Sequence, residues 1–448
     1  MALQPERVPA PVRGRRPRDR PDGKAVLPQA RAALPRDDEN APAAVRPVPG
    51  GGYPGGRSAQ LRARHPKALA DAGGAITHTV CLSGFLLGAA SSGSGVPRYA
   101  LRLTRALDAV AHDFPELELS LLTTPAGAEA VAPRALAVRE ARALRPLAAR
   151  PAARLAAEQI AVAGTRADLV HFFDLSGPRL RPARPFVTTI HDASVMHGFR
   201  RIRHAYKRLL YPWALAHARR VVAVSAFAAS EARRLFGVRE ERLAVVRSGP
   251  GFLDTAGSVV GAREAGGGKH AFVLYVGDLT LKKNVAFLVR AFDRAGSPER
   301  LVLAGRRGDG YAELRATIES AAGRDRIAVV EGPGDAELDG LYREATALAL
   351  PSRYEGFGFT PLEAMARGCP VLASDIPAVR EISGSGALLV PPDDEHAWSE
   401  AIRRVTSDER LRSELRRRGE ETVARYSWDE TARGLCRVWQ EAASDGSR

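Results

Sequence analysis

The most informative stretch of the chain is residues 347–366, which read Ala-Leu-Ala-Leu-Pro-Ser-Arg-Tyr-Glu-Gly-Phe-Gly-Phe-Thr-Pro-Leu-Glu-Ala-Met-Ala. The apolar run at its start is typical of a buried parallel strand, and Gly356 and Gly358 indicate a loop whose backbone approaches something closely. Pro361 fits the first turn of a helix that follows the loop. Backbone N–H groups at the start of that helix, beside the carboxylates of Glu355 and Glu363, suit a phosphate next to a sugar.

The same alternation of short apolar runs and amphipathic stretches recurs along the chain, which indicates parallel α/β domains. A length of 448 residues exceeds that of a usual single domain, so we expect two domains and a tail. The expected strands are Thr77–Leu82, Leu117–Leu122, Leu169–Phe173, Phe186–Ile190, Val221–Val224 and Leu243–Val246, then Phe272–Val276, Leu301–Ala304, Ile327–Val330, Ala347–Leu350, Val371–Ala373 and Leu388–Val390. A glycine-rich linker is expected over 255–269. The predicted units are a tail over 1–74, domains over 75–250 and 251–425, and a terminal helix over 426–448.

Residues 1–74 differ in composition from the rest of the chain. They hold 12 of the 31 prolines and 14 lysines and arginines against seven acidic residues, and so contribute +7 of the formal charge of +15. Because they lack apolar periodicity, they cannot bury enough surface to offset chain entropy, and we expect them to be disordered. Three interpretations stay open: a basic arm for anionic lipid or nucleic acid, a solvated extension, and a translation start placed too early.

Composition also bears on location. No apolar stretch follows the basic residues 13–20 before Pro28, so the central feature of a secretory signal is missing. No run approaches the roughly 20 consecutive apolar residues that a membrane span needs. The three cysteines, Cys81, Cys369 and Cys436, are scattered and odd in number, which favours a reducing cytoplasm over a disulfide framework or a metal cluster. We expect a cytoplasmic protein with each cysteine in a core.

The stretch 354–375 resembles the acidic motif and following strand of the retaining glycosyltransferases of family 4, which have two Rossmann-like domains in the GT-B fold. Further similar segments, in the same order as in that family, are Thr188–Asp192, Val222–Ser225, Phe252 after Ser248-Gly249, and Val276-Gly277 with Lys282–Asn284. The resemblance covers roughly residues 76–442. It implies a nucleotide-sugar donor in the second domain, an acceptor in the first, and a cleft between them. It also implies that the terminal helix, after a bend at 426–428, crosses back to the first domain.

Positive charge is expected where the donor's diphosphate binds. Breaking a sugar–diphosphate bond leaves negative charge, which the enzyme must stabilise in the transition state. The chain has no Asp-x-Asp element for a divalent ion, so we expect no metal and assign phosphate binding to Lys282 and Lys283. The alternative is an exposed lysine pair. Asp278 stands where many family members carry arginine, and Lys282 is the candidate replacement.

The resemblance gives the two acids separate roles. Glu363 is assigned to the ribose hydroxyls and Glu355 to the donor sugar near the reacting carbon, where a carboxylate also stabilises an oxocarbenium-like sugar. The alternative for Glu363 is a first-turn acid that only complements the helix dipole, worth about 0.3–1 kcal/mol. The sugar contacts are completed by backbone at Gly356, Phe357 and Gly358, and a phosphate contact by Thr360.

A histidine at a strand end is the candidate on the acceptor side. His191 follows the apolar run Phe186–Ile190, and the resemblance makes it a sugar or acceptor contact near the reacting centre. A lone histidine after a strand is usually structural, and His171 is a second such residue that we rank below His191.

A glycine-rich segment follows the first predicted strand. Gly93 and Gly95 precede a helix expected over Ala100–Ala111, and they resemble the family's first glycine-rich loop, near diphosphate and acceptor. Ser225 ends another strand, and the resemblance makes it an acceptor or phosphate contact. Arg98 stands where a dinucleotide-binding fingerprint needs its third glycine, so we expect no nicotinamide or other cofactor.

Residues 197–220 form a basic, aromatic-bearing stretch. Its cationic residues are Arg200, Arg201, Arg203, Lys207 and Arg208, beside Leu209, Leu210, Tyr211 and Trp213. Such a helix suits anionic lipid at the inner membrane face and a lipid-linked acceptor. The alternative is a solvated surface helix broken at Pro212.

The sequence therefore predicts a retaining, metal-independent hexosyltransferase of polysaccharide or glycoconjugate biosynthesis. It would move a sugar from a nucleotide-sugar to a hydroxyl of a glycan, lipid-linked or small-molecule acceptor. Two alternatives stay open: a nucleotide-sugar epimerase on the same fold and a non-catalytic nucleotide-sugar-binding protein. Nucleic-acid binding would rest on charge alone and is not expected.

Overall fold

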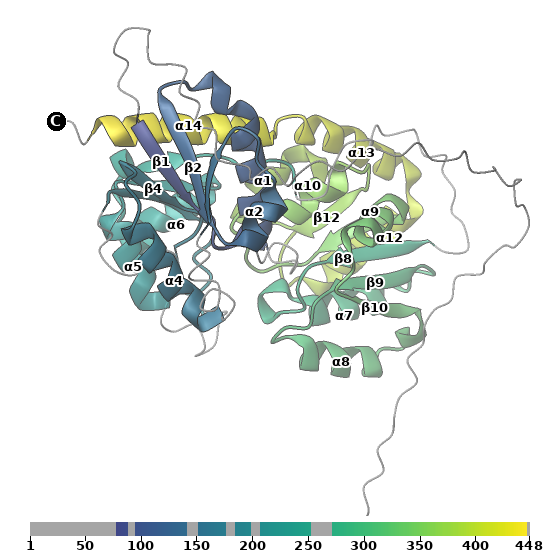
Figure 1. Cartoon of the computed structure of the whole chain (residues 1–448). Coiled ribbons are helices and arrows are strands. Elements are labelled where there is room, and N and C mark those ends of the chain that lie inside the picture. The colour runs from purple at the N-terminus through teal and green to yellow at the C-terminus, as the bar shows by residue number, and fades with distance from the viewer. Residues whose placement is uncertain are drawn as a thin grey trace, which may run out of the picture. The chain divides into compact units, whose positions relative to one another are not determined.

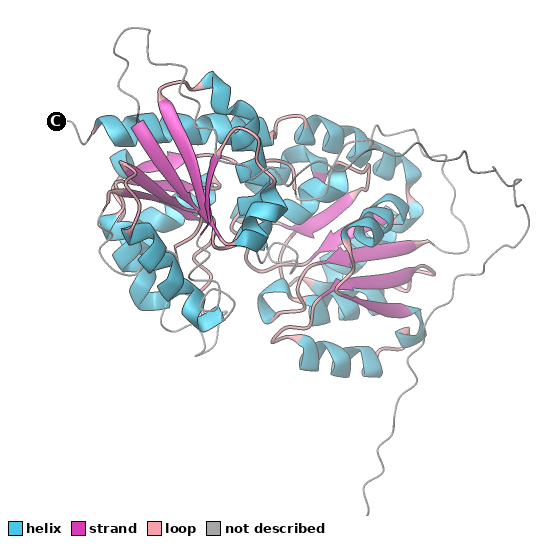
Figure 2. Ribbon diagram, in the orientation of Figure 1, coloured by secondary structure: helices cyan, strands magenta, loops and turns pink. Residues whose placement is uncertain are grey.

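The computed structural model describes residues 78–87, 95–140, 151–175, 184–198, 207–251 and 271–445, with only the backbone of 151–155. Several predictions fall outside the described residues: the tail, the linker over 255–269, Gly93, Phe252, Arg200, Arg201 and Arg203. Within the described ranges the chain forms two parallel β-sheets with helices packed against them (Figure 1, Figure 2). This confirms the predicted α/β class.

The first sheet has seven parallel strands in the order β3-β2-β1-β4-β5-β6-β7. The strands are β1 His78–Ser83, β2 Leu117–Thr123, β3 Ala137–Glu140, β4 Leu169–Phe172, β5 Phe186–Ile190, β6 Arg220–Ala223 and β7 Leu243–Val245. Its helices are α1 Gly95–Val110, α2 Pro125–Val131, α4 Pro151–Ala163, α5 Lys207–His217 and α6 Ala226–Phe236, with short 3-10 turns at Ala111–Asp113 and Glu240–Arg242. Strands β4 and β5 are buried along their whole length, which explains why they read as unbroken apolar runs.

The second sheet has six parallel strands in the order β10-β9-β8-β11-β12-β13. The strands are β8 Phe272–Val276, β9 Arg300–Gly305, β10 Ile327–Glu331, β11 Ala347–Leu350, β12 Val371–Ser374 and β13 Ala387–Val390. Its helices are α7 Val285–Ala295, α8 Tyr311–Ser320, α9 Asp335–Glu344, α10 Phe359–Met365, α11 Pro377–Ser383, α12 Glu395–Ser407 and α13 Glu409–Val423, with 3-10 turns at Leu281–Lys283, Arg324–Arg326 and Gly384–Gly386. All the predicted strands are present with boundaries within one residue, because each is an apolar run between polar turns.

Three local features differ from the sequence prediction. Strand β3 was missed because all four of its residues are exposed at the sheet edge, so it has no apolar pattern. Helix α1 begins at Gly95, earlier than the predicted Ala100. The alternative in which the helix breaks at Pro212 is wrong: α5 runs through this proline, six residues into the helix, where the bond to the Arg208 carbonyl is forgone.

The C-terminal helix α14, Trp428–Ser444, packs against α1 and the first sheet (Figure 1). Its Trp439 is fully buried, and the indole N–H donates to Nδ1 of His171 on β4 at 3.3 Å. At its start, the Trp428 indole N–H donates to the carbonyl of Gly251 at 2.9 Å. The indole also fills the space beside Gly249, where a Cβ would collide with it. The last helix is therefore tied both to the first sheet and to the segment that leaves it.

Apolar side chains from both sheets and from α14 form a continuous buried core. Cys81, Cys369 and Cys436 are all buried in it as free thiols, as predicted.

Candidate active site

The loop between β11 and α10 lies against the carboxyl ends of strands in the first sheet. A Cβ at Gly356 would collide with the backbone carbonyl of His191, directly after β5, so only glycine fits there. The carbonyl of Gly356 accepts a hydrogen bond of 2.6 Å from Ser225 Oγ, directly after Val224 that follows β6. Gly358 has a φ of 115°, which L side chains rarely adopt. The loop that the sequence singled out thus brings the two sheets together.

Ser225 makes two structural hydrogen bonds in this arrangement. Its Oγ donates to Gly356 and accepts from the backbone N–H of Ala228 at 3.0 Å, which caps the start of α6. Helix α10 that follows the loop has only seven residues, and the side chains of Lys282 and Lys283 bring positive charge to the site.

Lys283 and Glu355 form a partly buried ion pair with 2.5 Å between Nζ and Oε1. Glu355 is 9% exposed, and Lys283 lies in the 3-10 turn that follows β8. Burial raises the pKa of Glu355, but the charges of Lys283 and Lys282 outweigh burial and hold that pKa below its ordinary value. The carboxyl group is therefore ionised at neutral pH.

Lys282 reaches the other sheet. Its Nζ lies 3.4 Å from Oδ2 of Asp192, the residue after His191, and 6.0 Å from the centre of the Tyr354 ring. The other carboxylate oxygen of Asp192 accepts from the backbone N–H and the hydroxyl of Ser194 at 3.1 and 2.7 Å. The two adjacent lysines thus pair with acids from different sheets. Lys283 pairs with Glu355 after β11, and Lys282 pairs with Asp192 after β5.

His191 is a neutral imidazole held in a fixed orientation. Its Nε2 donates to the carbonyl of Phe173 at 2.7 Å, and its ring stands edge-on to Tyr99 with 4.6 Å between ring centres. Burial lowers the pKa of His191, against the hydrogen bond to Phe173 and the charges of Asp174 and Asp192, which raise it. With the proton on Nε2, Nδ1 is the acceptor nitrogen.

His171 differs from His191 in both burial and contacts. It is fully buried, and because the Trp439 indole can only donate to Nδ1, the ring proton sits on Nε2 and is donated to Thr189 at 3.1 Å. Burial lowers the pKa of His171 to about 3. This geometry is that of a structural histidine.

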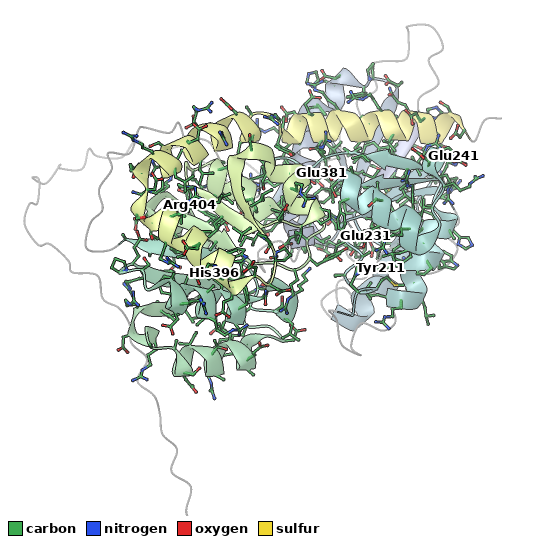
Figure 3. All side chains as sticks on the ribbon, turned by 180° about the vertical axis from the view of Figure 1, so that it is seen from behind. Tyr211, Glu231, Glu241, Glu381, His396 and Arg404 are labelled. Atoms are coloured by element: carbon green, nitrogen blue, oxygen red, sulfur yellow. The ribbon has the colours of Figure 1, made fainter. Side chains whose placement is uncertain are left out.

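A small polar pocket of about 70 Å³ opens beside His191 at the carboxyl end of the first sheet. Its lining residues are Val96, Asp174, Leu175, Thr189, His191, Asp192, Ser194, Val195, Lys207 and Tyr211, the last labelled in Figure 3. Gly95 begins α1 directly before the lining residue Val96 and is exposed.

Glu363 is buried in α10, 4% exposed, and Oε2 accepts a hydrogen bond of 3.0 Å from the hydroxyl of Tyr342. A Cβ at Gly251 would collide with the Glu363 side chain, so the segment that leaves the first sheet passes directly over it. Phe357 is also buried, with its ring centre 4.8 Å from that of Phe359. The remaining donor-side candidate, Thr360, is half-buried.

Asp278, the departure from the family pattern, is paired. Arg306, directly after β9, donates from Nε and Nη2 to the two carboxylate oxygens at 3.0 and 3.1 Å. Asp278 therefore holds the guanidinium of Arg306, which follows the neighbouring strand β9, at the end of β8. Neither Arg306 nor Tyr342 was predicted from the sequence. Arg306 could have been found from its place directly after a predicted strand, whereas no local pattern marks Tyr342.

The described part of the chain shows neither a metal cluster nor a membrane-spanning helix. Among them, no cluster of three or more histidines, cysteines, aspartates or glutamates is arranged to hold a metal ion. Of the helices that the structure describes, none combines the length and the apolar character required to span a bilayer.

Solved structures share this architecture of two parallel sheets, which is the GT-B class. Sucrose-phosphate synthase from Thermosynechococcus elongatus superposes with a TM-score of 0.63 and 21% identity over 82% of this chain and all of that one. Anabaena HepE in complex with UDP-glucose superposes with a TM-score of 0.57 and 17% identity over 83% of this chain and 99% of that one. At these identities the likeness shows the fold.

Two family models match the chain. One, described as Glycosyltransferase Family 4, matches residues 93–249, and the other, described as Glycosyl transferases group 1, matches residues 263–422. The two matches together take in both sheets. The chain therefore belongs to the glycosyltransferases of family 4, with a second half of the group 1 type.

Curated relatives agree over parts of the chain. The O-antigen chain mannosyltransferase RfbU of Salmonella typhimurium is 29% identical over 228 residues, which are 51% of this chain and 61% of that protein. A D-inositol 3-phosphate glycosyltransferase of Xylanimonas cellulosilytica is 30% identical over 175 residues, which are 38% of this chain and 42% of that protein. The aligned part thus covers less than two thirds of either relative.

Proposed function

We propose that this protein transfers a hexose from a nucleoside-diphosphate sugar to an acceptor hydroxyl, with retention of configuration and without a metal ion. The observation that carries the proposal is the ion pair of Lys283 with Glu355, because the loop that holds Glu355 also contacts the backbone of His191 at Gly356. A cation for the leaving diphosphate, an ionised carboxylate and a neutral imidazole thus come from three neighbouring segments: the turn after β8, the loop after β11 and the end of β5.

The second sheet supplies the donor contacts in this proposal. Lys283 and Lys282 stabilise the charge that develops on the diphosphate, and Glu355 accepts hydroxyl protons of the sugar near the reacting carbon. Glu363 binds the ribose hydroxyls, and the backbone around Gly358 follows the sugar. The complex of the structural neighbour HepE with UDP-glucose supports a nucleotide-sugar as the kind of donor.

The first sheet supplies the acceptor contacts. The pocket beside His191 is lined by carboxylate, hydroxyl and imidazole groups, which recognise hydroxyl groups of a sugar or polyol. The name of the relative RfbU, an O-antigen chain mannosyltransferase, supports a glycan acceptor. The proposal includes peripheral membrane contact through α5, because Leu209 on that helix is 78% exposed and its apolar side chain is open to a lipid surface.

Retention follows from attack on the face that the diphosphate leaves. The bond from the anomeric carbon to the phosphate oxygen breaks and the bond to the acceptor oxygen forms on the same side. The acceptor's proton passes to the departing phosphate oxygen, so no protein nucleophile takes part. Glu355 and the lysines stabilise the separated charges while this occurs.

The test begins with binding. Thermal unfolding is followed with UDP, GDP, ADP and their sugars, because a ligand at about a hundredfold excess over its Kd adds about 2.7 kcal/mol of stability. The stabilising sugar nucleotide is then incubated with glycan acceptors, with and without EDTA, and NMR of the product reports the anomeric configuration. We expect an EDTA-resistant product with the donor's configuration.

Variants separate catalysis from binding. Glu355→Gln should reduce transfer at least about a hundredfold, whereas the control Glu395→Gln, which breaks an exposed pair with Arg290, should leave it unchanged. Nucleotide binding without transfer to any acceptor would instead identify a binding protein. Full activity of Glu355→Gln would remove that residue from the mechanism.

A further inference from the structure

Helix α9 holds the side chain of Glu363 through a buried hydrogen bond. The Tyr342 hydroxyl donates to Glu363 Oε2 at 3.0 Å, and the tyrosine is fully buried. Burial, together with the neighbouring charge of Glu363, raises the pKa of Tyr342 well above its ordinary value. The phenol is therefore protonated at neutral pH and donates this hydrogen bond.

The same two helices are joined a second time, through the backbone. Arg367 follows α10, its side chain is 1% exposed, and its Nε donates to Asp339 of α9 at 2.7 Å. Its Nη1 donates to the backbone carbonyl of Glu363 at 3.3 Å. Glu363 is thus fixed by α9 at its carboxylate through Tyr342 and at its backbone through Arg367.

We propose that Tyr342 is the positioning residue that aims the Glu363 carboxylate at the ribose hydroxyls, so that α9 sets the preference for ribonucleotides over deoxyribonucleotides. The inference rests on the proposed function, in which Glu363 binds the ribose. A carboxylate that binds a diol must present its oxygens in one fixed plane. A buried donor on one oxygen fixes that plane before the nucleotide arrives, which lowers the ordering cost of binding.

The experiment measures Kd by calorimetry for the full chain with the nucleoside diphosphate, among UDP, GDP and ADP, that stabilises it most, and with its 2′-deoxy counterpart. The variants are Tyr342→Phe, which keeps the ring, and Glu363→Gln. The matched control is Ser399→Ala, which removes another buried hydroxyl whose bonds of 3.1 and 2.8 Å go to backbone carbonyls of α7 and α12.

Tyr342→Phe should weaken ribonucleotide binding about three- to tenfold, the range for one ordinary hydrogen bond, and leave deoxynucleotide binding unchanged. The ribose preference should fall in the same way for Glu363→Gln and stay at the wild-type value for Ser399→Ala. A general structural role of Tyr342 would weaken both nucleotides equally, and that result would overturn the inference.

Failure of the inference is distinct from failure of the proposed function. If wild type prefers the ribonucleotide and Glu363→Gln loses this preference while Tyr342→Phe keeps it, Tyr342 does not position the acid and only the inference fails. If the wild-type protein binds no nucleotide, the proposed donor site itself is wrong. Should Tyr342→Phe unfold, the double variant Tyr342→Phe with Glu363→Gln leaves no buried charge without its donor. Its ribose preference should equal that of Glu363→Gln alone if Tyr342 acts through Glu363, and a further loss in the double variant would overturn the inference.

Discussion

At the scale of single residues, variants of the ion pair between Lys283 and Glu355 can show whether the pair contributes to stability, to sugar transfer or to both. Lys283→Met leaves a carboxylate buried without its cation, which costs about 3 kcal/mol or more of unfolding free energy. The double variant with Glu355→Gln removes both charges, so most of the stability should return while sugar transfer stays absent. Denaturant unfolding and a transfer assay on the same preparations check this. Recovery of activity in the double variant would show that the pair is structural.

His171 gives a second prediction at this scale, on acid stability. Its pKa is about 3 in the folded protein and about 6.5 when unfolded, so the unfolded state binds more protons between these values. Stability is therefore complete above pH 6.5 and falls as the pH drops toward 3, by up to about 1.4 kcal/mol per pH unit. His171→Gln should lose less stability than wild type between pH 6.5 and 4 in urea unfolding. The exposed His112→Gln should keep the wild-type slope, and an unchanged slope for His171→Gln would contradict the assignment.

At the scale of elements, the loop between β11 and α10 is predicted to require glycine at position 356. Gly356→Ala places a methyl group against the His191 carbonyl, so the loop must move away from the first sheet. We expect loss of both stability and transfer. Gly340→Ala is the matched control, because it lies within α9 with open space around it and should stabilise the protein by about 0.5–1 kcal/mol. Equal behaviour of the two variants in thermal unfolding would refute the close contact.

The strands and the acidic loop were predictable from the sequence because their signals are local. Buried parallel strands such as β5 and β11 are apolar runs, and the glycines and acids of the loop lie within nine consecutive residues. Contacts between distant segments leave no such local pattern. The bond from Tyr342 to Glu363 and the pair of Arg306 with Asp278 depend on which helices and strands become neighbours. For the same reason, the sequence showed Ser225 at a strand end but not its bond to Gly356.

At the scale of the whole molecule, Glu381 of α11 caps a helix that packs on the first sheet. Its two carboxylate oxygens accept from the backbone N–H groups of Ala226 and Phe227 at 2.8 and 2.9 Å, and Figure 3 labels the residue. Ser225 takes the N–H of Ala228, so the first three N–H groups of α6 are all satisfied, two of them by the other half of the chain. The contact therefore couples the start of α6 to the second sheet, which carries the loop between β11 and α10.

Glu381→Gln keeps the shape of this side chain but removes the charge that favours it at a helix N-terminus. We expect faster hydrogen–deuterium exchange at the amides of residues 226 and 227, with a smaller change at 228, whose partner Ser225 is unaltered. Glu400→Gln is the control, because it removes a carboxylate that pairs only on the surface with Arg403 of the same helix. If the link between the halves must loosen during turnover, Glu381→Gln should also shift the KM for the donor while the control does not. Unchanged exchange at 226 and 227 would mean that Glu381 does not hold the two halves together in solution.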